Sequence, residues 1–334
     1  MERPDEFALI ARLFAPLAAS HDGALGLTDD CALFAGADGA QWAVTADAMV
    51  AGVHFFPDDP PDLIARKLLR VNLSDLAAKG AAPRFVLMTV CFPRDVTADW
   101  LERFAAGLKA DCQEFSIALI GGDTVSMPGP LTLSLTALGE LPAGTAILRA
   151  NARPGQRIWV SGTIGDGAFG LLAAQGKASG LAAEDRAALL DRYRLPRPRT
   201  ALGPLLRGIA AAGMDVSDGL VGDLGHICAC SRVGAEIEAA LLPLSDAATA
   251  AVRAGMGQGI VTALTGGDDY ELLFTADEQQ TEEIVSLSLR LGLRLTPIGR
   301  IIEGDVVRVL DAEGRSMLLG RGGYNHFDAD SRAL

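Results

Sequence analysis

Short apolar runs alternate with segments of helical periodicity along residues 1–140 of the chain. Four of these runs have strand character, at residues 42–45, 85–91, 116–120 and 131–138. Runs of this length, separated by helical segments, are typical of a sheet that is covered by helices. The pattern therefore predicts an α+β or α/β domain.

Two helices are predicted between these strands. Over residues 97–115 apolar residues recur at helical spacing, and Thr97 is a suitable N-cap. The other helix covers residues 61–79, with a proline in its first turn and Gly80 at its C-terminal cap. On this helix three polar residues lie three and four positions apart and share one face: Asn72, Asp75 and Lys79.

A linker is predicted between residues 140 and 156, where two prolines and two glycines fall close together. A second alternation of strands and helices begins at residues 157–161. The chain has 334 residues, 49% of them hydrophobic, which is enough to build a core in each of two domains. We therefore predict one domain at 1–145 and another at 146–334.

The acidic balance of the chain limits its partners. With 29 basic and 42 acidic residues the net charge is -13, which disfavours a nucleic-acid polymer or an anionic membrane. No run approaches the roughly 18 apolar residues of a membrane span, and no basic and apolar leader is seen, so we expect a soluble cytoplasmic protein. The five cysteines include no C-x-x-C pair, which argues against a disulfide framework or a zinc ribbon.

Two other motifs resemble nucleotide-binding or phosphate-binding sequences but do not by themselves predict such a site. Residues 165–170 match G-x-G-x-x-G, but no strand ending in an acidic residue follows about 20 residues later, so we predict a tight turn between strand and helix. Residues 196–199, Pro-Arg-Pro-Arg, are predicted to form an exposed loop. Its arginines are either solvated or in contact with phosphate.

Aspartates recur in short turns where apolar runs end, and no nucleophile accompanies them at a recognisable spacing. Carboxylates gathered from distant segments repel one another unless a cation lies between them, and Mg²⁺ prefers such oxygen ligands. The pattern favours an enzyme that handles metal ions and phosphate. The aspartates are Asp29 and Asp30, Asp47, Asp75, Asp123, Asp215 and Asp218, and Asp268 and Asp269.

Two of these turns offer more than a carboxylate. The glycines of Gly121-Gly122-Asp123-Thr124 leave backbone N–H groups free to approach a phosphate. After Asp215, a helical run offers its N-terminus to an anion, and Ser217 lies on the same side as Asp215 if the backbone is extended. His54, which follows the turn at Asp47, is either a partly buried structural residue or a substrate contact.

Over nearly its whole length the chain resembles the thiamine-monophosphate kinase family, which belongs to a superfamily with aminoimidazole ribonucleotide synthetase and selenophosphate synthetase. The motifs occur in the family's order. They lie at residues 7–10, 28–32, 47–55, 71–78, 120–124, 215–220, 222–227, 266–272 and 323–327.

This resemblance implies a two-domain aminoimidazole ribonucleotide synthetase-like fold, in which N-terminal sheets pair in a homodimer and a C-terminal α/β domain completes the cleft. It also implies transfer of the γ-phosphoryl group of ATP to thiamine phosphate with several Mg²⁺ ions. The implied metal ligands are Asp30, Thr45, Ala46, Asp47, Asp75, Asp123, Asp215 and Asp218. The implied ATP contacts are Gly122, Asp123, Arg149 and Ser217, and the implied thiamine contacts are His54, Asp268 and Tyr324.

The chain departs from the family's pattern at a few positions. Thr28 replaces a glycine and Ala46 a threonine, although Ala46 still offers a backbone oxygen to a metal. In the thiamine pocket Asp268 replaces the commoner glutamate and Tyr324 the commoner tryptophan. These changes keep open a noncatalytic nucleotide-binding module as the alternative function.

The chemistry of the implied acceptor fits a site without a catalytic base. A phosphate monoester is already largely dianionic at neutral pH, since its second pKa is near ~6. The barrier is repulsion between two anions, which cations held by the aspartates would lower. We therefore expect direct transfer without a phosphoenzyme.

Overall fold

The structure is a computed structural model that describes residues 6–319. Its N-terminal half contains a five-stranded sheet in the order β1-β2-β5-β3-β4. Neighbouring strands are antiparallel except β3 and β4, which are parallel because a helix connects them. The strands are β1 (Ala32–Ala35), β2 (Ala40–Val50), β3 (Ala82–Pro93), β4 (Ala118–Met127) and β5 (Thr132–Pro142). The four predicted strands are thus confirmed, as β2, β3, β4 and β5.

One predicted strand end is wrong. β4 continues past Ile120, so Gly122 and Asp123 lie inside an edge strand and not in a turn. Gly122 has a φ of 149°, and a Cβ atom there would lie 1.8 Å from the carbonyl oxygen of Met88. Glycine therefore allows β4 to approach β3 closely and to continue beyond a shift in the pairing register.

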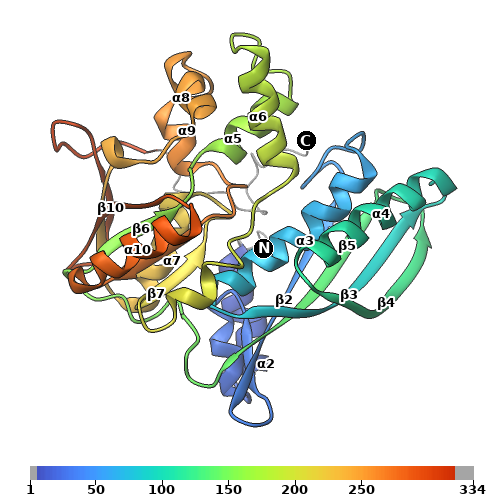
Figure 1. The fold of residues 1–334 in the computed structure, drawn as a ribbon, viewed down its shortest axis with the longest axis horizontal. Coiled ribbons are helices and arrows are strands. Elements are labelled where there is room, and N and C mark those ends of the chain that lie inside the picture. The colour runs from blue at the N-terminus through green and yellow to red at the C-terminus, as the bar shows by residue number, and fades with distance from the viewer. Residues whose placement is uncertain (1–5, 320–334) are drawn as a thin grey trace.

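Two helices, α3 (Pro61–Ala78) and α4 (Ala98–Glu114), lie together on one face of this sheet (Figure 1). Thr97 Oγ1 accepts a hydrogen bond from the backbone N–H of Trp100 at 3.2 Å, which confirms the predicted N-cap. Gly80 follows α3 with a φ of 72°, as a helix C-terminus requires. The expected polar face of α3 is buried, because α3 also packs against two strands of the second sheet, β7 (Ala212–Asp215) and β9 (Leu272–Ala276).

The C-terminal half is built on a six-stranded sheet in the order β11-β8-β10-β6-β9-β7. Its other strands are β6 (Arg157–Ser161), β8 (Gly234–Glu238), β10 (Leu295–Ile302) and β11 (Val307–Leu310). The helices are α5 (Asp166–Ala174), α6 (Ala183–Arg194), α7 (Leu220–Ser231), α8 (Asp246–Arg253), α9 (Ile260–Thr265) and α10 (Thr281–Leu291). Short helical turns are η3 (Gly203–Leu206), η4 (Ala239–Leu241) and η5 (Glu278–Gln280). The two sheets with their helices confirm the predicted two-domain α/β class.

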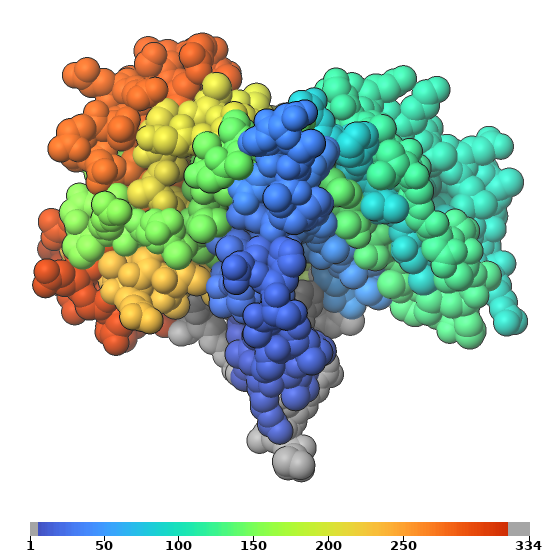
Figure 2. All heavy atoms as spheres, turned by 90° about the horizontal axis from the view of Figure 1, so that it is seen from below, coloured from blue at the N-terminus to red at the C-terminus, as the bar shows by residue number. Residues whose placement is uncertain are grey.

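The N-terminal segment lies across the seam between the two halves, as the dark blue atoms in Figure 2 show. It consists of short helical pieces, and the ring of Phe7 lies 4.6 Å from that of His226 on α7. The pieces are α1 (Glu6–Leu9), η1 (Ile10–Phe14), α2 (Ala15–Ala18) and η2 (Asp22–Leu27). No helix within residues 6–319 combines the length and the apolar character needed to cross a membrane.

The loop predicted to be exposed at 196–199 is instead part of the domain junction. Pro196 and Pro198 are buried, and the carbonyl oxygen of Pro196 accepts a hydrogen bond from Arg70 Nη1 at 3.0 Å. Just before the loop, Arg194 Nε donates to Asp59 Oδ1 at 2.6 Å. These contacts hold residues 196–199 against the N-terminal half. The local sequence composition does not predict them, because the partner residues are far away along the chain.

Candidate active site at the domain junction

Three carboxylates from distant parts of the chain meet at the junction of the two domains. Asp30 follows η2, Asp75 lies on α3 and Asp215 ends β7. Each offers an oxygen atom within 4.8 Å of the others. The strand β7 brings Asp215 to this point because it packs against α3.

The proximity of these groups changes their acidity. Burial raises the pKa of Asp75 well above its ordinary value, and the charges of Asp47, Asp215 and Asp30 raise it further. Burial and the charge of Asp30 also raise the pKa of Asp215, to about 7. A divalent cation bound between them would relieve this repulsion, and the oxygen donors are the type that Mg²⁺ prefers.

Two basic residues hold one side of the cluster. Lys79 is fully buried, and its Nζ lies 2.5 Å from Asp29 Oδ1, 2.7 Å from Asp30 Oδ2 and 3.0 Å from the carbonyl oxygen of Gly213. Burial alone would lower the pKa of Lys79, but Asp30 and Asp29 raise it to about 12. Arg149 Nε donates to Asp30 Oδ1 at 2.8 Å.

The resemblance implies an ATP contact for Arg149 and assigns no role to Lys79 or Asp29. In the structure Arg149 contacts Asp30, a predicted metal ligand, and its backbone N–H also donates to Asp29 Oδ2 at 2.8 Å. A signal for Lys79 existed, since its spacing placed it on the same helix face as Asp75. Asp29 belongs to the recurring aspartate turns of the sequence, but the resemblance assigned a role only to its neighbour Asp30.

The strand β2 supplies the next candidate ligands. Thr45 Oγ1 donates to Asp75 Oδ2 at 2.6 Å, and the backbone N–H of Asp47 donates to Asn72 Oδ1 at 3.2 Å. The side chain of Ala46 is exposed between these two less exposed residues, as alternation along a strand requires. Any role of Ala46 in binding a metal therefore falls to its backbone oxygen.

The loop after β7 is held by hydrogen bonds to the carboxylate of Asp223, for which the sequence predicted no role. Asp223 Oδ2 accepts the backbone N–H groups of Ser217 at 3.0 Å, Asp218 at 3.2 Å and Gly219 at 3.2 Å. Burial raises the pKa of Asp223 well above its ordinary value, and Asp218 and Asp215 add to the shift. These three amides of the loop before α7 are thus hydrogen-bonded to the chain's own carboxylate.

The loop at residues 266–271 is hydrogen-bonded to the loop that follows β7. The N–H of Asp268 donates to the carbonyl of Ser217 at 2.9 Å, and that of Tyr270 donates to Val216 at 2.8 Å. Asp268 has a φ of 68°, in the left-handed region that few residues other than glycine adopt. Movement of one loop must therefore displace the other.

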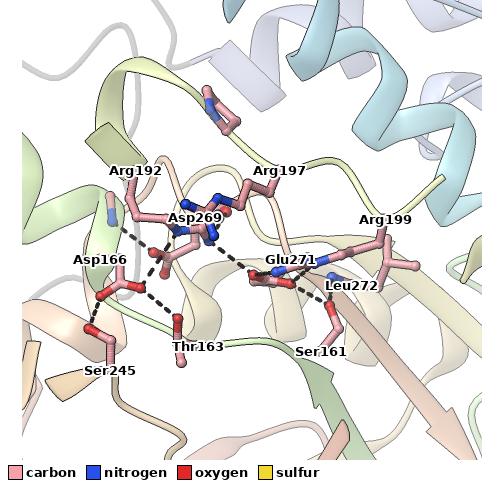
Figure 3. Close-up of polar contacts among 12 residues, drawn as sticks. Ser161, Thr163, Asp166, Arg192, Arg197, Arg199, Ser245, Asp269, Glu271 and Leu272 are labelled. Atoms are coloured by element: carbon pink, nitrogen blue, oxygen red, sulfur yellow. Dashed lines mark hydrogen bonds and ion pairs between the residues drawn. The ribbon is translucent and has the colours of Figure 1, made fainter. Parts of the chain in front are cut away.

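Behind this loop lies a buried polar network, shown in Figure 3. Asp269 accepts the backbone N–H groups of Gly165 at 2.6 Å and Gly167 at 2.9 Å, which anchors the loop to the start of α5. Glu271 is fully buried and accepts hydrogen bonds from Arg192 Nη2 at 3.0 Å and from Arg199 Nε at 2.5 Å. The sequence predicted no role for Arg192 and left Arg199 as either solvated or in contact with phosphate, because their partner Glu271 is about 70 to 80 positions away.

One cavity of about 850 Å³ connects the aspartate cluster with the predicted acceptor residues. It is lined from both domains, and the predicted site residues in its wall are Asp47, His54, Asp75, Asp215, Ser217, Asp218 and Asp268. The Nδ1 of His54 accepts the backbone N–H of Val50 at 3.0 Å, and His54 also lines the cavity, so its contact with a substrate stays a prediction.

The structure does not bring every predicted residue together. Gly122 and Asp123 lie on β4, three strands from β2, which at about 4.8 Å per strand is roughly 14 Å across the sheet. Neither lines the cavity formed by the described residues. Tyr324 lies outside the described residues.

Comparisons with known proteins agree with this architecture. Residues 28–141 match the N-terminal domain and residues 153–311 the C-terminal domain of AIR synthase related proteins. The chain is 42% identical to the thiamine-monophosphate kinase of Caulobacter vibrioides over 97% of its own length and 91% of the relative's.

Solved structures show the same relationship. A thiamine-monophosphate kinase from Stenotrophomonas maltophilia is 44% identical with a TM-score of 0.76, covering 93% of this chain and 98% of that one. The structure of AaThiL complexed with AMPPCP and TMP is 29% identical with a TM-score of 0.85, covering 98% of this chain and 99% of that one. The chain belongs to the thiamine-monophosphate kinase family within the AIR synthase-related proteins.

Proposed function

We propose that the protein transfers the γ-phosphoryl group of ATP to thiamine phosphate, giving thiamine diphosphate and ADP, in a Mg²⁺-dependent and direct in-line reaction. The observation that carries this proposal is the cavity at the domain junction, whose walls include Asp75 and Asp215 as well as His54 and Asp268. A single space thus joins a cation-binding cluster to a compartment for an organic acceptor. The relatives named above, with AMPPCP and TMP in one of them, support the same pair of substrates.

The residues present fit Mg²⁺. Asp30, Asp75 and Asp215 supply oxygen atoms within 4.8 Å of one another. Burial, and after it the charges of neighbouring carboxylates, raises the pKa of Asp75 and of Asp215, and a bound cation would favour the charged form of both. We assign these three as ligands, with Asp47 and Asp218 nearby in the cavity wall. When bound, Mg²⁺ neutralises charge on the transferring phosphoryl group.

The chain's own residues position the reactants. The acceptor phosphate is already anionic and supplies the attacking oxygen, so no side chain has to remove a proton. The hydrogen bonds between the loop after β7 and residues 266–271 hold the two ends of the cavity in a fixed relation. Positioning of this kind accounts for much of the catalysis of phosphoryl transfer.

We also propose a homodimer that forms through the open face of the N-terminal sheet. No helix of the described residues covers this face in Figure 1, and large apolar side chains are exposed along its strands, namely Phe34, Phe85, Leu87 and Val125. Isolated exposed apolar side chains are common, but a set on one sheet face is typical of an interface. Gly122 and Asp123 lie on the edge strand β4 of this sheet, so a second copy on the open face would lie near them.

The direct test is an assay of purified protein with ATP and Mg²⁺. Chromatography should show thiamine diphosphate and an equal amount of ADP when thiamine phosphate is the acceptor, and neither with thiamine or formylglycinamidine ribonucleotide. ATP binding with no ADP formed from any acceptor would instead favour the noncatalytic nucleotide-binding module. Release of ADP only with the ribonucleotide would place the chain with aminoimidazole ribonucleotide synthetase.

A further inference from the structure

A second buried lysine of α3, Lys67, lies in the cavity wall away from the aspartate cluster. Its Nζ donates to the carbonyl oxygen of His54 at 3.1 Å and lies 3.1 Å from Asp268 Oδ1. It also lies 3.9 Å above the ring centroid of Tyr193. An ammonium group has three N–H donors, and these three partners occupy its surroundings.

The contacts of Lys67 join the two domains. Lys67 and His54 belong to the N-terminal half, whereas Tyr193 on α6 and Asp268 belong to the C-terminal half, and all four line the cavity. Lys67 is 2% exposed, but the side chain of Asp268 is 27% exposed. The lysine is therefore shielded by its partners, while part of the Asp268 carboxylate still faces the cavity.

The helix α3 sets the distance between this place and the metal cluster. Lys67, Val71 and Asp75 follow one another at four-residue intervals, and all three line the cavity. Residues at this spacing lie on one face of a helix, and eight residues correspond to about 12 Å along the axis. A rigid helix thus separates the buried lysine from the phosphoryl-transfer end.

The charge of Lys67 determines whether Asp268 presents a net negative charge or only a hydrogen-bond acceptor to a ligand. An unpaired Asp268 would be a full negative charge and would attract the cationic ring of thiamine phosphate. Lys67 and Asp268 form an ion pair whose net charge is close to zero. The carboxylate oxygen of Asp268 that does not contact Lys67 is a hydrogen-bond acceptor. This end of the cavity then suits a neutral ring that carries an amino group, and not a cation.

We propose that Lys67 is a positioning residue for the acceptor, an inference that rests on the proposed function. Lys67 fixes the Asp268 carboxylate so that its free oxygen accepts a hydrogen bond from the amino-substituted heteroaromatic ring of thiamine phosphate. The lysine's charge keeps the cationic ring away from this end. Lys67 acts through Asp268 and does not touch the reacting atoms.

The test compares Lys67→Met with Lys109→Met, a change at an exposed lysine on α4. Binding of thiamine phosphate and of ATP is measured separately by calorimetry, and kcat and KM are measured by ADP release. We expect Lys67→Met to weaken thiamine phosphate binding about tenfold, as loss of a charged hydrogen bond would. We expect its affinity for ATP and its kcat to remain within about twofold, and Lys109→Met to change nothing.

A double-mutant cycle with Asp268→Asn shows whether Lys67 acts through that residue. If it does, Lys67→Met adds no further loss of thiamine phosphate affinity once Asp268→Asn is present. Multiplying losses would overturn the proposal, as would equal losses for ATP and thiamine phosphate. If Lys67→Met alone does not fold, Asp268→Asn and the double variant still carry the test, because removing both partners leaves no unpaired buried charge.

Binding and turnover separate this inference from the proposed function. If the unmodified protein binds thiamine phosphate but forms no thiamine diphosphate, the proposed function fails, and the comparison of variants by calorimetry still stands. If it turns over normally and Lys67→Met binds thiamine phosphate as tightly as before, the role of Lys67 fails and the function stands.

Discussion

Two buried lysines, Lys67 on α3 and Lys79 directly after it, have different surroundings. Lys79, at the C-terminal end, contacts Asp29 and Asp30, and Asp75 and Asp215 lie close by. Lys67, about 18 Å earlier along the axis, is paired with Asp268 and is covered by Tyr193. The same residue type on one helix thus serves two kinds of site.

The difference lies in the charge that remains after pairing. Around Lys79 and Arg149 the carboxylates outnumber the basic groups, and burial together with these charges raises the pKa of Asp75 and of Asp215. This is where we propose that a metal cation binds. Around Lys67 one lysine meets one aspartate, and what remains is hydrogen-bonding capacity. One end suits cations and phosphate, and the other suits a neutral polar ring.

The largest expected effect is at the cluster. Asp75→Asn removes a carboxylate on which the charge neutralisation depends, and we expect kcat to fall about a thousandfold or more. The fold should persist, because Asn keeps the size of the side chain and removes a repelled charge. The rate of ADP release and the thermal midpoint measure these two effects. Asp99→Asn, at an exposed position on α4, is the control, and a near-normal rate for Asp75→Asn would remove it from the metal site.

The second prediction concerns Asp123, which the structure separates from the cluster. If it acts in the site of a second copy, Asp75→Asn and Asp123→Asn are each inactive alone, but a mixture that exchanges subunits regains about a quarter of normal activity. Half of the dimers are then mixed, and each has one intact site. Activity is measured after refolding the two variants together. No recovery, with mixed dimers demonstrated by differently tagged chains, would place Asp123 outside the partner's site.

The third prediction compares the two lysines directly. Lys79→Met leaves Asp29 and Asp30 without their buried partner, and we expect the free energy of unfolding to fall by about 3–5 kcal/mol. Lys67→Met should cost clearly less, because Asp268 is 27% exposed whereas the Asp30 side chain is 1% exposed. Urea unfolding of both variants without added metal gives the comparison. Equal losses would contradict the different burial of the two pairs.

The sequence predicts the architecture better than it predicts these pairings. Regular periodicity gave the strands and α3 and α4, and the capping roles of Thr97 and Gly80 follow from local chemistry. The continuation of β4 through Gly122 depends on the neighbouring strand, which periodicity does not contain. Partners such as Lys67 and Asp268 are about 200 positions apart, so their pairing becomes visible only when the domains pack.

The resemblance to a family predicted which aspartates lie together better than the spacing of the aspartates did. It selected Asp30, Asp75 and Asp215, which the fold gathers into one cluster. It did not identify Asp223, whose carboxylate accepts hydrogen bonds from three backbone amides of the loop after β7. Residues that support a site rather than contact a ligand are recognised by their hydrogen bonds, and these are not written in any local pattern.

The smallest expected effect is the pH dependence of stability in the metal-free protein. The pKa of Asp215 is raised from 3.8 to about 7, so the folded protein holds a proton that the unfolded chain releases. The stability from this group is complete below the ordinary value and is lost as the pH rises through about 7, and Asp75 shifts in the same direction. In the presence of a chelator, the thermal midpoint should therefore fall as the pH is raised from about 5 to about 8.

Added Mg²⁺ should reverse this fall most strongly at the higher pH, where the carboxylates are charged, and Asp75→Asn should make the midpoint depend less on pH. A midpoint that does not change with pH in the chelated protein would mean that Lys79 and Arg149 already balance the cluster, and the two ends of α3 would then differ less in charge than their contacts indicate.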